Sequence, residues 1–215
     1  MKKIIGAVLF SLSLLAVYAG DVQLNASVAL IDSHIQQTIG TLEILAATDQ
    51  AASGDWDKMK SLLTEAQKQC VPSTFWFARP DGSYFAVEKG LVGQSLSDRD
   101  YFPKVMGGQR VVGDLVVSKS TGKKSIVVTV PITVDGKVIG ALGSSLFAEG
   151  FSAMLVKELG LSEGAVFFAL NKEGSAALHS NPALIFTPVI DRESSYATSP
   201  LTGWRVALHP SVVSQ

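Results

Sequence analysis

Cysteine is almost absent from this chain of 215 residues, in which Cys70 is the only thiol. A single thiol excludes an internal disulfide, so stability must come from burial and hydrogen bonding. No histidine lies near Cys70 in the sequence. We therefore interpret Cys70 as a buried or half-buried structural thiol rather than a nucleophile.

An excess of charge of one sign is also lacking. The chain has 18 basic and 19 acidic residues, and its first 19 residues carry two of the basic ones and no acidic ones. The remainder therefore has a net charge of −3. Such a chain has no electrostatic reason to bind nucleic acid or an anionic membrane surface.

Catalytic motifs are missing as well. His34, His179 and His209 are scattered, and none has a second ligand at metal spacing. The sequence has no Gly-x-Ser-x-Gly elbow and no phosphate loop. We expect neither enzymatic activity nor a cofactor or metal.

What the sequence does contain begins with a targeting signal. Lys2 and Lys3 precede the apolar run 4–16, and small residues at positions 17 and 19 flank Tyr18. This pattern predicts a secretory signal over residues 1–19 and a periplasmic or secreted chain. An uncleaved N-terminal helix that tethers the chain is the alternative. No cysteine follows the apolar run, which argues against a lipid anchor.

Residues 20–70 are predicted to form a long helix and a second helix, which runs from Trp56 to about Gln69 and is stopped by Pro72. Apolar residues on the long helix recur at spacings of four and three, which places them on one stripe. The stripe comprises Leu24, Val28, Ile31, Ile35, Thr38, Leu42 and Leu45. It is either the seam of a homodimeric coiled coil or the face of a helix that lies on its own domain.

Residues 71–148 have the character of an antiparallel sheet. Short apolar runs at 75–78 and 84–87 flank the turn 79–82, and a glycine-punctuated loop and a short helix to about Met106 follow. Three more strands are expected at 111–118, 125–134 and 138–146, and Asp135-Gly136 is a strong hairpin signal. The fold class predicted is α+β, with helices against one face of a five- to six-stranded sheet.

Residues 149–215 are predicted to form a connecting helix and an abbreviated second module. A hairpin is expected at 165–179, and one closing strand at 203–208. Three strands cannot bury much surface alone. This second module must therefore pack on the first or on a partner.

The order and spacing of several motifs resemble the Cache superfamily of bacterial extracellular sensor domains. The matching segments are 79–84 (RPDGSY), 96–102 (LSDRDYF), 120–125 (STGKKS), 130–132 (VPI) and 136–143 (GKVIGALG). The resemblance implies a long N-terminal helix and one or two PAS-like modules, of the double-Cache type 1. It also implies a membrane sensor kinase or chemoreceptor as partner, although this chain ends at Gln215 without a second span or an output domain. The second module here is truncated relative to that family.

The same resemblance implies a ligand pocket in the membrane-distal module. Its first candidate is Arg99, whose guanidinium matches a carboxylate bidentately. Tyr101 and Phe102 would add a phenol and an apolar wall. The alternative is that Arg99 pairs with Asp98 or Asp100 and only pins the loop to the sheet. Further donors are expected from Tyr84, Ser118, Ser120, Thr121, Lys123 and Thr129 on facing strands or the adjoining loop.

The amino-acid-binding members of the family carry an aspartate that accepts from the ligand's ammonium. That place falls here at Ser145, or at Ser144 if the register slips by one. A serine hydroxyl cannot balance a buried ammonium, whose unpaired charge costs several kcal/mol. We therefore expect a carboxylate ligand without an α-amine. The alternatives are a protein-interaction module with a vestigial pocket, and an amino-acid or amine sensor.

Overall fold

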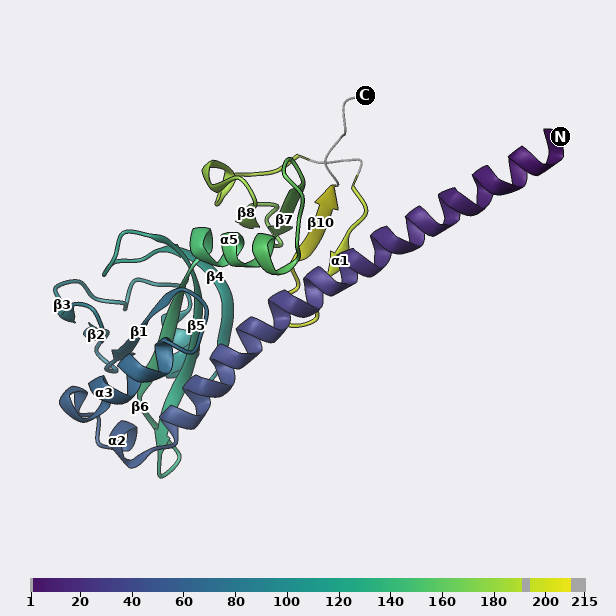
Figure 1. Ribbon diagram of the computed structural model, residues 1–215. Helices are drawn as coiled ribbons and strands as arrows, with labels where there is room; N and C mark the ends of the chain where they lie inside the picture. Colours follow the sequence, from purple (N-terminus) through teal and green to yellow (C-terminus); the bar gives the residue numbers. More distant parts are fainter. Residues whose placement is uncertain (1, 191–193, 210–215) are drawn as a thin grey trace.

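One long helix runs along two antiparallel sheets, a larger one of six strands and a smaller one of four (Figure 1). This computed structural model describes the backbone of residues 2–190 and 194–209, and the side chains within that range from residue 21 onward. The predicted α+β fold class, with a long N-terminal helix and a second smaller module, is confirmed.

The elements follow one another simply. The helices are α1 (Lys2–Ala46), α2 (Asp49–Ala52), α3 (Trp56–Gln67), α4 (Phe102–Met106), α5 (Ala148–Glu158) and the 3-10 turn η1 (Pro182–Leu184). The larger sheet, in the order β3-β2-β1-β6-β5-β4, comprises β1 (Ser73–Ala78), β2 (Tyr84–Ala86), β3 (Gly90–Val92), β4 (Val111–Val117), β5 (Lys124–Val134) and β6 (Lys137–Phe147). The smaller sheet, in the order β8-β7-β10-β9, comprises β7 (Val166–Leu170), β8 (Ala176–His179), β9 (Ala197–Thr198) and β10 (Arg205–His209).

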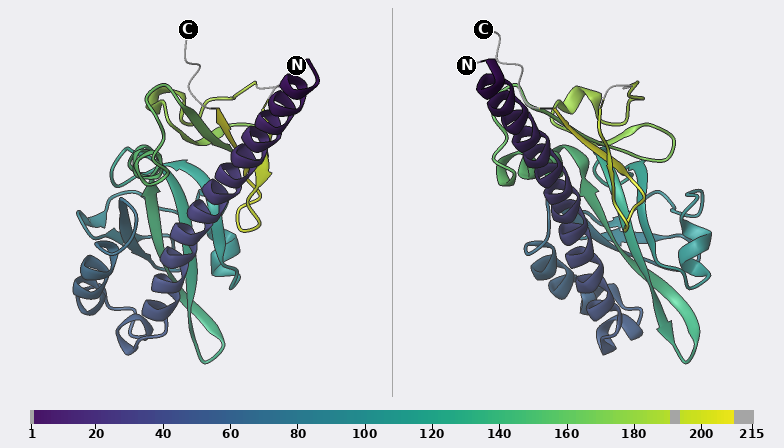
Figure 2. Two further views of the ribbon diagram at one scale, coloured as in Figure 1. Left: turned by 45° about the vertical axis from the view of Figure 1, so that its right-hand side comes forward. Right: turned by 90° about the vertical axis from the view of Figure 1, so that its right-hand side faces the viewer.

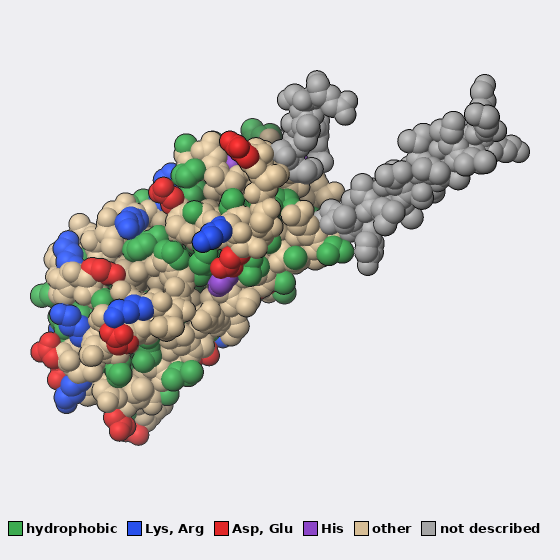
Figure 3. Space-filling model, viewed as in Figure 1, with side chains coloured by type: hydrophobic (Ala, Val, Ile, Leu, Met, Phe, Trp, Pro, Cys, Tyr) green, Lys and Arg blue, Asp and Glu red, His purple; other side chains and the backbone are tan. Residues whose placement is uncertain are grey.

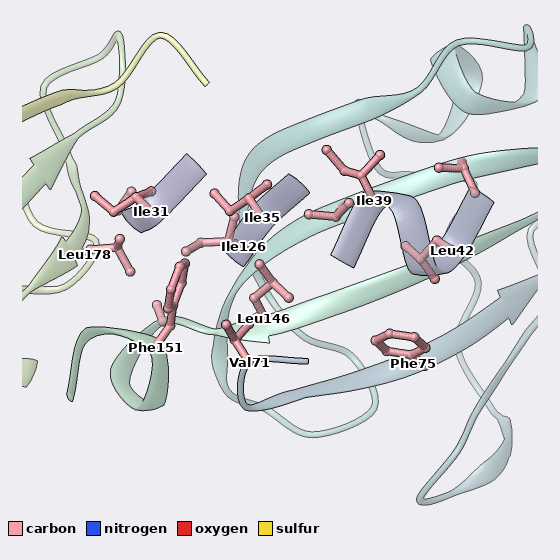
Figure 4. Close-up of a cluster of buried hydrophobic side chains, with 14 of the residues drawn as sticks. Ile31, Ile35, Ile39, Leu42, Val71, Phe75, Ile126, Leu146, Phe151 and Leu178 are labelled. Atoms are coloured by element: carbon pink, nitrogen blue, oxygen red, sulfur yellow. The ribbon is translucent and has the colours of Figure 1, made fainter. Parts of the chain in front are cut away.

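The apolar stripe of α1 is buried in the chain's own core. Ile31, Ile35 and Leu42 are fully buried, and so is Ile39, which the predicted stripe omitted. Figure 4 shows these side chains directed at the strands and at α5. Each fully buried Ile or Leu contributes about 1.5–3 kcal/mol. Of the two interpretations of the stripe, the structure therefore selects packing on its own domain, and a dimer through α1 would have to use another face.

The inner face of the larger sheet supplies the other half of this core. Phe75 on β1, Ile126 on β5 and Leu146 on β6 point toward α1 (Figure 4). Beside them, Phe151 of α5 and Leu178 of β8 carry the same apolar cluster into the smaller module. The second module therefore packs on the first, as a sheet too small to be stable alone requires.

The turns agree closely with the sequence. Asp135 and Gly136, at φ of 50° and 76°, connect β5 to β6, and two positive φ angles are what a tight two-residue hairpin needs. Asp55 caps α3 by accepting a hydrogen bond from the backbone N–H of Asp57 at 3.0 Å.

Three short elements differ from the prediction. Residues 90–92, expected to be loop, form β3, and β9 lies in the polar stretch before the last strand. The short helix α4 begins at Phe102, although the small and acidic residues of segment 97–100 (Ser-Asp-Arg-Asp) favour an earlier start. Strands of two or three residues carry no periodic signal and form here because a neighbouring strand pairs with them.

Figure 2 shows α1 passing beside both sheets. On the face drawn in Figure 3, basic and acidic side chains are interspersed among polar and apolar ones. The predicted signal segment, residues 1–19, lies outside the residues whose side chains are described. Within the part of the chain that does have described side chains, no helix is long and apolar enough to cross a membrane.

Candidate ligand-binding site

A small cavity, here called the distal cavity, lies on the outer face of the larger sheet. The loop before α4 covers it, and its volume is about 10 Å³, which suffices for roughly one water molecule. It is lined by Trp76, Tyr84, Leu96, Arg99, Tyr101, Val116, Ser118, Lys119, Ser120 and Ser145.

Six of the nine predicted site residues line this cavity. They are Tyr84, Arg99, Tyr101, Ser118, Ser120 and Ser145. Phe102 packs in the apolar cluster beside the cavity without lining it. Thr129 is fully buried and donates to the carbonyl of Leu142 at 2.8 Å, a bond between adjacent strands.

The turn after β4 holds the remaining predicted donors away from the cavity. Thr121 lies in this turn, where its hydroxyl accepts a hydrogen bond from the backbone N–H of Lys123 at 3.3 Å. The ammonium of Lys123 lies 4.1 Å from the centre of the Phe147 ring. Both side chains are thus used to hold the turn and the start of β5.

Arg99 connects the covering loop to the edge of the sheet. Its Nη2 donates to the carbonyl of Val117 at 2.7 Å, so neither Asp98 nor Asp100 is its partner. Asp98 instead accepts from the ammonium of Lys119 at 2.5 Å, and this hydrogen bond lowers the pKa of the Asp98 carboxyl. The Nε of Arg99 is buried and has no hydrogen-bond partner among the described residues.

Four residues that line the distal cavity were not predicted from the sequence: Trp76, Leu96, Val116 and Lys119. Trp76 is the largest of them. Its indole lies over Gly143 on the neighbouring strand, so close that a Cβ at position 143 would lie 2.1 Å from a ring atom. The indole N–H donates to the hydroxyl of Ser145 at 3.2 Å. The rings of Tyr84 and Tyr101 have their centres 6.4 and 6.3 Å from that of Trp76. The indole therefore fills most of the space between the sheet and the loop.

The register of β6 decides which serine faces the cavity. Ser145 lies on the cavity side. Ser144 pairs with Phe75 and Val128, which belong to the inner core, and its hydroxyl is buried without a partner among the described residues.

The electrostatics of the distal cavity are one-sided. Two cationic side chains, Arg99 and Lys119, line it, whereas no Asp or Glu does. Lys119 is paired with Asp98 outside the lining, so Arg99 is the cation of the lining that has no carboxylate partner among the described residues. Burial raises the pKa of Tyr101, and burial likewise raises that of Tyr84. Both phenols consequently stay protonated near neutral pH and remain available as hydrogen-bond donors. The cavity thus offers donors and positive charge to whatever enters it.

Metal ligation has no comparable site in the described part of the chain, where no three His, Cys, Asp or Glu side chains are placed to hold an ion together.

The two sheets, with the outer face of the larger one covered by the loop before α4, form a two-module fold that is similar to several solved domains. The ligand-binding domain of the Pseudomonas fluorescens chemoreceptor CtaA, in complex with L-valine, aligns with a TM-score of 0.73 at 14% identity over 92% of this chain and 98% of that one. The sensor domain of the V. cholerae histidine kinase DctB aligns with a TM-score of 0.66 at 12% identity over 83% of this chain and 72% of that one.

A third similar structure is the ligand-binding domain of the Pseudomonas aeruginosa amino acid chemoreceptor PctC in complex with GABA. Its TM-score is 0.65 at 16% identity, over 87% of this chain and 94% of that one. No family model matches the sequence, and no curated protein matches it. At such identities the likeness concerns the fold, and the Cache-type fold implied by the motifs is confirmed.

Proposed function

We propose that this chain is an extracytoplasmic sensor or binding module whose distal cavity takes a small carboxylate without an α-amine. The observation that carries the proposal is the unpaired Nε of Arg99 beside a cavity that is lined by two cations and by no carboxylate. A buried donor without a partner is rare in folded proteins and is satisfied when an acceptor binds.

An amine would fit this cavity poorly. A bound ammonium would meet Arg99 and Lys119, and the hydroxyl of Ser145 already accepts from Trp76. Like charges within a few ångströms are strongly unfavourable in a partly desolvated site. A short monocarboxylate or dicarboxylate brings only the charge that the lining complements.

Size sets a further condition on the ligand. A volume of about 10 Å³ does not admit even a short carboxylate. Binding therefore requires the covering loop or the indole of Trp76 to move, which would give the module a second state. A ligand that binds the open state better would shift the population toward it.

The partner and the compartment follow from the same proposal. The similar domains belong to a histidine kinase and to chemoreceptors, so we propose a membrane sensor of one of these kinds as the partner. The predicted signal at residues 1–19 supports a periplasmic or secreted chain. An uncleaved N-terminal helix remains the alternative form of attachment.

Thermal unfolding tests the ligand class directly. We expect acetate, malonate or succinate to raise the Tm of the wild-type chain, and Arg99→Ala to abolish the shift. Arg110→Ala serves as the matched control, because Arg110 is exposed and pairs with Glu43 at 3.1 Å, away from the cavity. A full shift retained in Arg99→Ala would refute the assignment of the site.

Two alternatives are outcomes of the same experiment. The similar structures hold L-valine and GABA, so a shift with these ligands and none with plain carboxylates would favour an amino-acid or amine sensor. The small volume of the distal cavity favours a protein-interaction module with a vestigial pocket. A protein-interaction module would show no change in Tm with any of these ligands.

A further inference from the structure

A second and much larger cleft, here called the inter-module cleft, lies where the two modules meet. Its volume is about 810 Å³, within the range of cavities that hold small molecules. One wall comes from the loop before α4 and from β4, and the other from the turn between β7 and β8 and from the segment before β10.

The indole N–H of Trp204 and the hydroxyl of Tyr101 line this cleft on largely buried side chains, and neither donates a hydrogen bond to a described residue. The side chain of Trp204 is only 2% exposed, yet its indole N–H makes no hydrogen bond within the described part of the chain. The edge of that ring lies against Gly113, which also lines the cleft. The hydroxyl of Tyr101, on a side chain that is 3% exposed, likewise forms no hydrogen bond with a described residue.

The walls of the inter-module cleft also contain hydrogen-bond acceptors. A β-bulge at Gly113, whose φ is 93°, shifts the register of β4 just before Asp114. The half-buried carboxylate of Asp114 and the exposed one of Asp100 form no ion pair or hydrogen bond with described side chains. The other two acids of the cleft are already paired, Asp98 with Lys119 and Glu173 with Lys172.

This arrangement points to a class of ligand. Free donors and free carboxylates stand together, so a ligand of one charge would satisfy some of these groups and repel the others. A hydroxyl both donates and accepts, and the rings of Trp204 and Phe186 offer apolar surface for C–H groups. We propose that the inter-module cleft binds a neutral polyhydroxylated small molecule of the sugar class.

A chain of hydrogen bonds connects this cleft to α1. The backbone N–H of Trp204 donates to the hydroxyl of Thr202 at 3.2 Å, and that hydroxyl donates to Ser199 at 2.8 Å. Ser199, which is 1% exposed, donates in turn to the carboxylate of Asp32 on α1 at 2.6 Å. Because Trp204 and Thr202 both line the cleft, a ligand that orders them stabilises the contact of the smaller module with α1.

Thermal unfolding in D-glucose, maltose, L-valine and malonate tests the binding site. At a hundredfold excess over Kd we expect one of the two sugars to raise the Tm by roughly 5–10 °C. Trp204→Phe, which removes only the N–H and part of the ring, and Asp114→Asn should abolish the shift. Trp56→Phe is the matched control, because Trp56 stacks on Phe85 on the opposite side of the larger sheet, and it should retain the full shift.

Hydrogen exchange tests the connection to the helix. The sugar should slow amide exchange in α1 around Asp32, and Ser199→Ala should keep the Tm shift but lose this protection. No shift with either sugar, or a shift that survives Trp204→Phe, would overturn the proposal. So would a shift dependent on Trp204 that only L-valine or malonate produces. A malonate shift that depends on Arg99 and survives Trp204→Phe instead reports on the distal cavity, so the two proposals fail separately.

Discussion

The distal cavity and the inter-module cleft share Arg99 and Tyr101, yet their volumes are about 10 and 810 Å³. The distal cavity lies within one module, between a sheet and its own covering loop. The inter-module cleft lies between two modules that meet mainly through α1 and the inner core. The same two side chains therefore face a tightly packed interior on one side and an open space on the other.

The difference arises from how each wall is built. In the distal module, the indole of Trp76 lies in the gap that Gly143 leaves, and such matching of large and small residues brings an interior to the density of a crystal. Between the modules, Trp204 lies against Gly113 in a looser match, since a Cβ at position 113 would still lie 3.4 Å from the ring, and the turns beside this pair leave the cleft open. The distal cavity must therefore rearrange before it can bind a ligand, whereas the inter-module cleft can bind one without rearrangement.

The largest effect is expected from Trp76→Ala, which would make the two cavities more alike. Removing a buried tryptophan costs about 3–5 kcal/mol, to be measured by urea unfolding. Added indole should recover part of the lost Tm, because an apolar cavity of its shape binds the missing ring. Wild-type chain should not respond to indole. A loss below about 1 kcal/mol would show that Trp76 does not fill the distal cavity.

Gly143→Ala tests the same fit from the other strand. A Cβ there would lie 2.1 Å from the Trp76 ring, and overpacking of this kind costs about 1–3 kcal/mol. Gly40→Ala is the control, since position 40 lies in α1 with no atom within 4 Å of an added Cβ. It should be neutral or stabilise the chain by up to about 1 kcal/mol. Equal effects of the two changes on the free energy of unfolding would contradict the proposed packing.

Ser199→Ala should weaken the contact between the smaller module and α1. Losing a buried hydrogen bond to a carboxylate costs about 1–2 kcal/mol. The double variant Ser199→Ala/Asp32→Asn should lose much less free energy of unfolding than the sum of the two single losses, because the two residues share one hydrogen bond. Ser27→Ala is the matched control: Ser27 is also buried on α1, but its hydroxyl bonds only to Gln23 one turn away. Additive losses in denaturant titrations would argue against the bond.

The smallest effect concerns the outer face of the smaller sheet, where His179 stacks on Phe168 with ring centres 5.8 Å apart. Burial lowers the pKa of His179 in the folded chain below its usual 6.5, and its Nδ1 accepts from the backbone N–H of Asn181 at 2.8 Å. The unfolded chain therefore binds the proton more readily. The contribution of His179 to stability is complete above pH 6.5 and is lost as the pH falls through the folded pKa. The Tm of His179→Gln, scanned from pH 8 to pH 5, should fall less on acidification than that of the wild type.

Part of the candidate site could be predicted from the sequence. Arg99, Tyr84 and Tyr101 were found because they belong to motifs whose order is recognisable along the chain. Trp76 was missed because its importance depends on Gly143 lying opposite it, and nothing local encodes that register. Thr129 lies on the same face of the sheet as Trp76, in register with Gly143, but its hydroxyl is bonded to the carbonyl of Leu142 and it does not line the distal cavity. The inter-module cleft carried no sequence signal at all, because its walls come from turns far apart in the chain.

The sequence by itself determined the long helix with its buried stripe, the Asp135-Gly136 hairpin and the stops between elements. These depend on spacing and turn chemistry over a few residues, which act before any tertiary contact exists. Only the tertiary structure decided that the stripe packs on the chain's own sheets, that Trp76 fills the distal cavity, and that Ser199 reaches Asp32. Such outcomes depend on the shapes of surfaces brought together by folding, and local periodicity carries no information about those shapes.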